Sequence, residues 1–157
     1  MAKILVSYYS RSGNTEEMAE FVAEGARDAD GKVELKKVQN VSVDELLTYD
    51  AIIIGSPTYY GDMSAEVKDL IDRSFEHHGG LNGKVGGAFS SAANVGGGNE
   101  TTVLSVLHAM LIHGMIVPGT PEGDHYGPTS VGGPDENVAD ECRKLGRRVA
   151  ELADKLM

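Results

Sequence analysis

Cysteine is nearly absent from this chain, whose 157 residues include a single one, Cys142. One cysteine cannot close an internal disulfide, form a C-x-x-C redox pair or hold an iron–sulfur cluster. Apolar residues spaced by three and four positions surround it in 138–156, which predicts a buried place on a helix and not a nucleophile. Any electron chemistry must therefore come from a bound organic cofactor, and we expect no metal site.

Basic residues and long apolar runs are also scarce. Lys and Arg number 14 against 24 Asp and Glu, which gives a formal charge of −10. This balance argues against a nucleic-acid backbone or an anionic membrane as the main partner, because both bind through clustered cations. The apolar run at 4–6 is too short for a signal peptide, and no stretch approaches roughly 18 apolar residues. We expect no membrane insertion and a cytoplasmic location.

Short apolar runs alternate with helical patterns along the chain, and a single domain, 1–157, is expected at this length. The runs at 4–6 and 51–54 are typical of central parallel strands, whereas 33–38 alternates like an edge strand. The remaining expected elements are strands at 85–90 and 115–117, helices at 15–26, 64–75, 99–113 and 136–156, and a weak turn at 43–47. The pattern predicts an α/β fold, a doubly wound parallel sheet with helices on both faces. Its ligand should lie beyond the carboxyl ends of the strands.

The loop 10–15, directly after the first predicted strand, has the sequence Ser-Arg-Ser-Gly-Asn-Thr. Backbone N–H groups at a helix N-terminus, joined by hydroxyl donors, form a cradle for one phosphate without needing a lysine. The chain has no G-x-G-x-x-G fingerprint here and no G-x-x-x-x-G-K-(S/T) motif anywhere, so ATP or GTP hydrolysis is not predicted. Taken alone, the loop could equally be a helix cap and a turn.

Two further loops end at the same predicted edge. The loop 55–64 carries the adjacent residues Tyr59 and Tyr60, which can flank a planar ring, and Gly61, which permits a backbone rearrangement. The loop 90–99 contains three successive glycines and offers unhindered backbone donors to a ligand edge. A phosphate cradle, an aromatic platform and a row of backbone donors together describe a flat heterocycle that carries one phosphate.

Over essentially its whole length the sequence resembles the flavodoxin superfamily, because loop 10–15 matches the pattern (S/T)-x-(S/T)-G-x-T. The segments 3–6, 55–64, 96–98 and 113–115 are similar to the tryptophan-repressor-binding-protein-like branch, which includes NAD(P)H:quinone oxidoreductases. The resemblance implies bound FMN and a flavodoxin-like five-stranded parallel sheet in the order 2-1-3-4-5. Quinone reductases of this branch are usually longer, with insertions near the third strand and in the late loop that this chain lacks.

The resemblance also assigns roles to individual positions of this chain. The residues assigned to FMN are Ser10, Arg11, Ser12, Gly13, Asn14 and Thr15 at the phosphate, Pro57, Thr58, Tyr59, Tyr60 and Gly61 at the ring, and Ser91, Ala92, Ala93, Asn94, Val95 and Gly96 around its polar edge. His113 is expected beside the flavin and is the candidate catalytic residue. His77, His78 and Tyr126 are candidates to frame a substrate pocket.

Two functions fit these features. The leading hypothesis is an FMN enzyme that passes two electrons from NAD(P)H to a quinone, with both substrates using one pocket in turn. The alternative is a flavodoxin that carries single electrons between redox partner proteins, which the short length and the acidic side chains of 62–76 favour. A cofactor-free interaction module is a third possibility, and a colourless protein that takes up no FMN would indicate it.

The segment 103–112 is apolar on nearly all sides of its predicted helix. A helix that lies on a sheet normally exposes a polar face, so this one predicts a contact with another subunit. We therefore expect a homo-oligomer, a dimer or a tetramer, which favours the enzyme over the electron carrier.

Overall fold

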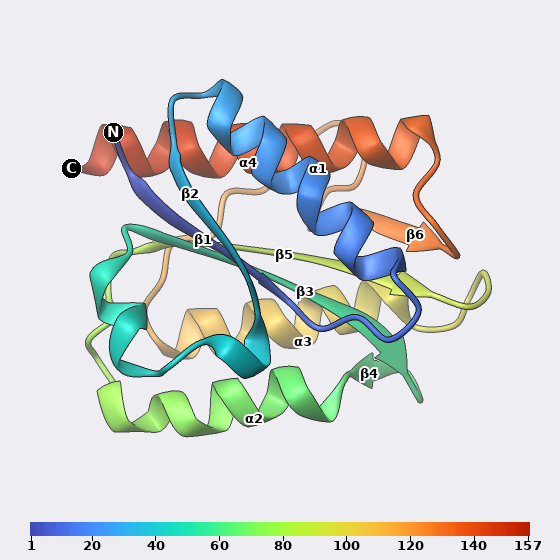
Figure 1. Ribbon diagram of the computed structural model, residues 1–157, viewed down its shortest axis with the longest axis horizontal. Coiled ribbons are helices and arrows are strands. Elements are labelled where there is room, and N and C mark those ends of the chain that lie inside the picture. The colour runs from blue at the N-terminus through green and yellow to red at the C-terminus, as the bar shows by residue number, and fades with distance from the viewer.

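The computed structural model describes all 157 residues and is built on one six-stranded sheet (Figure 1). The strands are β1 (Lys3–Tyr8), β2 (Lys32–Lys37), β3 (Ala51–Tyr59), β4 (Asp62–Met63), β5 (Val85–Ala92) and β6 (Thr129–Val131). Five strands run parallel in the order β2-β1-β3-β5-β6, while β4 pairs antiparallel with β3. The predicted doubly wound sheet is confirmed, with β5 and β6 as its fourth and fifth parallel strands and its switch point between β1 and β3.

Helices cover both faces of this sheet. The helices α1 (Asn14–Asp28) and α4 (Glu136–Leu156) lie together on one face, and α2 (Ala65–Arg73) and α3 (Asn99–Ile112) lie on the other (Figure 1). The 3-10 helices η1 (Val38–Asn40), η2 (Asp44–Thr48) and η3 (Ser74–His77) complete the second layer. None of the helices combines the length and the hydrophobicity needed to span a bilayer.

Each face of the sheet has its own core, because successive side chains of a strand point to opposite sides. In β3, Ile53 packs with α1 and α4, whereas Ile52 and Ile54 pack with the layer of α2 and α3. Where α1 crosses α4, a Cβ atom on Gly25 or Gly146 would lie 2.0 Å from a carbonyl oxygen of the other helix. The two helix backbones therefore touch, and larger residues at these positions would separate them.

The fifth parallel strand differs from its prediction at 115–117. That segment contributes one bridge, between Ile116 and Val85, and the strand itself is β6, at 129–131. Pro118 lacks the N–H that a continued ladder would need. The chain returns to the sheet at Gly127, where a Cβ atom would lie 2.0 Å from the carbonyl oxygen of Ala88. The sequence Thr-Ser-Val of β6 has no apolar run, so periodicity alone does not reveal it.

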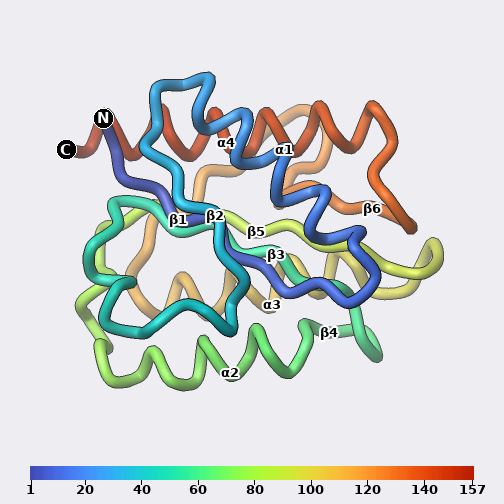
Figure 2. Tube along the Cα trace, in the orientation of Figure 1, coloured from blue at the N-terminus to red at the C-terminus, as the bar shows by residue number.

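The turns that follow β1, β3 and β5 gather at one end of the sheet, away from both chain termini (Figure 2). The ammonium group of Met1 lies 3.0 Å from the carboxylate of Asp154, which places the termini together at the other end. The loops 10–15, 57–62 and 93–98 therefore lie together at the carboxyl ends of the central strands and form one edge.

Candidate functional site

The loop between β1 and α1 presents unpaired backbone donors. Gly13 precedes α1 with a left-handed φ of 99°, and no side chain caps this helix N-terminus. The N–H groups of Arg11 and Ser12 donate to no acceptor in the protein, whereas that of Gly13 donates to Ser10 Oγ at 3.1 Å. The N–H groups in the first turn of a helix also have no partner within the helix. Donors that converge at the positive end of a helix form a site for a phosphate group.

A buried hydrogen bond joins this loop to the end of β5. Thr15 Oγ1 and Ser91 Oγ lie 3.0 Å apart, and both residues are buried. On the other side, Tyr8 Oη donates to Glu16 Oε1 at 2.7 Å. Burial, reinforced by this bond, raises the pKa of Tyr8 to about 12, so the phenol keeps its proton. Both contacts fix the first turn of α1 against the sheet edge, which gives the cradle a defined shape.

The strands β3 and β4 form a hairpin whose turn is Tyr60 and Gly61. Tyr59 pairs with Asp62 where the turn begins and ends. Tyr60 and Gly61 have φ values of 51° and 80°, the left-handed pair that a type I′ turn requires. Glycine adopts this conformation freely but tyrosine rarely does, and the Tyr60 side chain is 108% exposed. A strained, fully exposed aromatic residue at a ligand edge indicates a functional position.

The neighbouring Tyr59 is held within the protein. Its ring meets that of Tyr9 edge-on, with centroids 6.5 Å apart, and the Arg11 guanidinium lies 5.2 Å from its centroid. Burial raises the pKa of the Tyr59 hydroxyl, and the charge of Arg11 offsets part of that rise. Tyr9, which the sequence analysis did not select, therefore helps to build the aromatic platform. Of the two adjacent tyrosines, Tyr60 is the one left free to contact a planar ligand.

The loop after β5 is the third loop at this edge of the sheet. Residues 93–96 are exposed, and Val95 is 85% exposed. Gly97 N donates to the Asn94 carbonyl at 3.1 Å, and Ser90 Oγ donates to the Asn99 carbonyl at 2.6 Å, which fixes the start of α3. The loop is thus anchored at both ends, while its middle presents backbone groups to solvent.

One buried polar atom at this edge tests whether a flavin mononucleotide fits. Thr58 Oγ1 is shielded from solvent and makes no hydrogen bond. An unpaired buried hydroxyl costs on the order of 1–3 kcal/mol, so its presence between Pro57 and Tyr59 indicates a polar partner. Together with the cradle at Gly13 and the exposed Tyr60, the residues fit a flat heterocycle with one phosphate.

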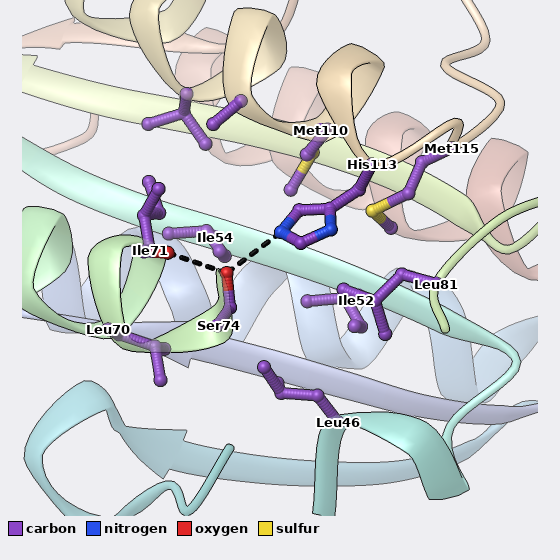
Figure 3. Close-up of a pocket in the computed structure, with 12 residues that line it drawn as sticks. Leu46, Ile52, Ile54, Leu70, Ile71, Ser74, Leu81, Met110, His113 and Met115 are labelled. Atoms are coloured by element: carbon purple, nitrogen blue, oxygen red, sulfur yellow. Dashed lines mark hydrogen bonds between the residues drawn. The ribbon is translucent and has the colours of Figure 1, made fainter. Parts of the chain in front are cut away.

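Three of the predicted histidines lie at the opposite end of the sheet. His113 follows α3, and its Nε2 is 2.8 Å from Ser74 Oγ (Figure 3). His78 lies beside it, with ring centroids 6.0 Å apart, and His77 Nε2 is 2.7 Å from Asp44 Oδ1. The helix α3 has 14 residues, so its two ends are roughly 20 Å apart. For a flavin bound by the same chain, this corrects the expectation that His113 lies beside the ring. It likewise corrects the expectation that His77 and His78 frame the substrate pocket.

The pair of Ser74 and His113 borders a small apolar cavity of about 30 Å³ (Figure 3). That volume accommodates a single water molecule and no substrate. Ser74 is 3% exposed, and its hydroxyl also lies 2.6 Å from the Ile71 carbonyl. His113 Nδ1 is buried without a partner, so no third group orients the ring. The pair therefore lacks the access and the orientation that nucleophilic catalysis needs.

Tyr126 lies in the segment between Ile116 and β6, apart from these histidines. It meets His125 edge-on, with ring centroids 6.5 Å apart, and lines a cavity of about 120 Å³ with Glu100 and Asp124. Burial raises the pKa of Asp124, whose carboxylate accepts a hydrogen bond from the N–H of Thr129. Glu100 belongs to the first turn of α3, so Tyr126 is the one substrate candidate toward the carboxyl edge.

The fold and this edge define a doubly wound protein with a site for a mononucleotide at the switch point of its sheet. A family model described as Flavodoxin domain matches residues 5–94, and the chain belongs to this family. The predicted resemblance to flavodoxins is thereby confirmed.

Relatives and solved structures extend the match over nearly the whole chain. A protein named NAD(P)H dehydrogenase (quinone) from Archaeoglobus fulgidus is 38% identical over 192 positions, covering 99% of this chain and 100% of the relative. One of the same name from Acidovorax ebreus is 37% identical and covers 99% and 98%. The crystal structure of a flavodoxin, WrbA-like protein from Agrobacterium tumefaciens superimposes with a TM-score of 0.86 at 29% identity over 100% of both chains. The alignment of 192 positions exceeds this chain of 157 residues, so the first relative carries insertions.

The surroundings of His113 predict a loss of stability in mild acid. Burial, and then the charge of His78, lowers the pKa of His113 below its usual value of 6.5. As the pH falls through that value the unfolded chain takes up this proton first, so the folded state loses stability. We expect the unfolding free energy in urea to fall more from about pH 7.5 to about pH 5.5 in the wild type than in His113→Gln. Parallel profiles for the two proteins would contradict this.

Proposed function

We propose that the protein binds FMN at the carboxyl edge of its sheet and passes two electrons from NAD(P)H to a quinone. The observation that carries the proposal is the uncapped, glycine-led N-terminus of α1, which faces the same edge as the exposed Tyr60. Two curated relatives named NAD(P)H dehydrogenase (quinone), matched over 99% of this chain, support the choice of reaction. The flavin supplies the redox chemistry, and the protein binds and orients it.

Each part of the edge has a role in this proposal. The loop 10–15 would hold the phosphate through backbone N–H groups and hydroxyls, and Tyr60 would lie against the ring. The backbone of 91–96 would line the polar edge of the ring, and Thr58 Oγ1 would gain a hydrogen-bond partner. NAD(P)H and the quinone would meet the same exposed face in turn, because the sheet presents one nucleotide edge. We propose a cytoplasmic location.

The alternative function, an electron carrier that docks on partner proteins, rests on the acidic side chains of the hairpin and α2. Two of these carboxylates are neutralised within the helix, since Asp72 lies 2.6 Å from Lys68 and Asp69 lies 2.9 Å from Arg73. These pairs reduce the charge that could steer a basic partner. The local ion pairs therefore weaken the argument for the electron carrier.

Anaerobic reduction of the FMN-loaded protein separates the two functions. We expect NADH or NADPH to bleach the flavin absorbance within the time of mixing, and a quinone added afterwards to restore it. The nicotinamide then leaves before the quinone binds, so initial rates should give the parallel lines of a ping-pong mechanism. A flavin that stays oxidised with both nicotinamides but accepts electrons from dithionite would favour the carrier.

A matched pair of glycine variants tests the phosphate cradle. Gly13 and Gly79 have φ values of 99° and 89°, and a Cβ atom on either would meet nothing within 4 Å. Alanine at each should impose a similar left-handed strain of roughly 1–2 kcal/mol. Only Gly13→Ala should weaken FMN binding, by roughly 5- to 30-fold in a fluorescence titration. Equal FMN affinities of the two variants would exclude the loop from the binding site.

The proposed homo-oligomer rests on the C-terminal end of α3. One face of α3 is buried on the sheet, and the exposed apolar residues gather at its end, where Leu111 is 58% and Ile112 is 73% exposed. The apolar side chains along α3 are therefore largely covered by the protein itself, and the exposed apolar surface lies at the C-terminal end of the helix. We expect sedimentation velocity to give a dimer or a tetramer for the wild type and a smaller species for Ile112→Asp. A monomeric wild type would contradict the proposal.

A further inference from the structure

The tip of the hairpin is tied to the start of α3 by one hydroxyl group. Thr101 Oγ1 donates to the Gly61 carbonyl at 2.9 Å, across 40 positions of sequence. The same hydroxyl lies 2.8 Å from the carbonyl of Gly98, the residue before α3. Thr101 thus faces two acceptors with one proton.

The surroundings of the two carbonyls decide which one receives the proton. The Gly98 carbonyl already accepts from the N–H of Thr102 and from Thr102 Oγ1, both at 2.9 Å. A carbonyl oxygen has two lone pairs, so both are in use. The Gly61 carbonyl receives no other hydrogen bond. The Thr101 hydroxyl therefore donates its hydrogen bond to the Gly61 carbonyl.

The two loops also approach each other backbone to backbone. A Cβ atom on Gly98 would lie 2.7 Å from Gly61 Cα and 3.2 Å from its carbonyl oxygen. Gly96, in the same loop, also has a positive φ, 72° against 102° at Gly98, but a Cβ atom there would meet nothing within 4 Å. The contact between Gly98 and Gly61 thus brings the carbonyl within reach of Thr101.

The hairpin is short, and its base is held by Met63, which packs against the core on the side of α2 and α3. The strand β4 has two residues, and the Tyr60 side chain is fully exposed in a left-handed conformation. A short two-stranded hairpin has little stability of its own. The hydrogen bond from Thr101 acts at the tip of the hairpin, on the turn that carries Tyr60.

We propose that Thr101 is a positioning residue of the flavin site. Its hydroxyl holds the turn of Tyr60 and Gly61 against Gly98, and so orders the turn before the ring binds. The inference rests on the proposed function, because Tyr60 is taken as the residue that contacts the ring. A turn that is already ordered loses less entropy on binding, so the tie should increase the affinity for FMN.

Hydrogen exchange of the FMN-free protein tests the tie itself. Thr101→Val removes the hydroxyl at nearly constant volume, and Thr101→Ser keeps it. Thr102→Val is the matched control, because it removes a hydroxyl that binds Gly98 and not Gly61. We expect amides of 58–63 to exchange about fivefold faster in Thr101→Val, the equivalent of about 1 kcal/mol, and near the wild-type rate in the other two. Unchanged exchange in Thr101→Val would overturn the tie.

The two glycines offer a second, independent variant pair. Gly98→Ala places a methyl group against the Gly61 backbone, whereas Gly96→Ala also places alanine at a positive φ but without that clash. We expect faster exchange of 58–63 in Gly98→Ala than in Gly96→Ala. Equal rates would show that the two loops do not depend on each other, and would overturn the inference.

A fluorescence titration with FMN tests the positioning role. We expect the dissociation constant to rise about fivefold in Thr101→Val and to stay within about twofold of the wild type in Thr101→Ser. An unchanged constant in Thr101→Val would overturn the role of Thr101 and leave FMN binding intact. A wild type that binds no FMN would instead overturn the proposed function, together with any role of Thr101 toward the flavin.

Discussion

The hydrogen bond between Thr15 and Ser91 is the contact on which the geometry of the edge depends. It joins the first turn of α1 to the end of β5 across 76 positions of sequence, past the intervening strand β3. Both side chains are buried, so breaking the bond would leave two hydroxyls unpaired away from water. The bond therefore holds the first turn of α1, which follows loop 10–15, close to the end of β5, which leads into loop 93–98.

The way the helices begin distinguishes a ligand edge from an ordinary sheet edge. Side chains of Ser64 and Asp135 cap α2 and α4, and each accepts a hydrogen bond from one N–H of the first turn. The helices α1 and α3 begin instead at Gly13 and Gly98, both left-handed and without a side-chain cap. At α3 the Thr102 hydroxyl donates to the Gly98 carbonyl and the Thr101 hydroxyl donates to the Gly61 carbonyl, which joins this N-terminus to the hairpin. The N-terminus of α1 is left open for an anion.

Much of this arrangement could be predicted from local sequence patterns. The apolar runs of β1 and β3, the hydroxyl-rich loop 10–15 and the two tyrosines are continuous segments whose meaning does not depend on distant residues. The contacts of Thr101 could not be predicted, because its hydroxyl meets a carbonyl 40 positions away. The position of His113 in the fold could not be predicted for a related reason: its motif is local, but only the direction of α3 determines at which end of the sheet it lies. The strand β6 escaped prediction because pairing with β5, and not its own hydropathy, makes it a strand.

The exposure of this edge determines whether a second planar molecule could reach a ring bound there. Tyr60 is 108% and Val95 is 85% exposed, and these residues lie on the two loops that would flank the ring. A ring between two such exposed side chains would leave one face accessible to a second planar molecule. Direct stacking requires such access, whereas transfer to a partner protein requires only an exposed ring edge. For direct stacking, the strained turn matters because it holds the aromatic side chain of Tyr60 at one side of the opening. Planar substrates would enter there one after the other.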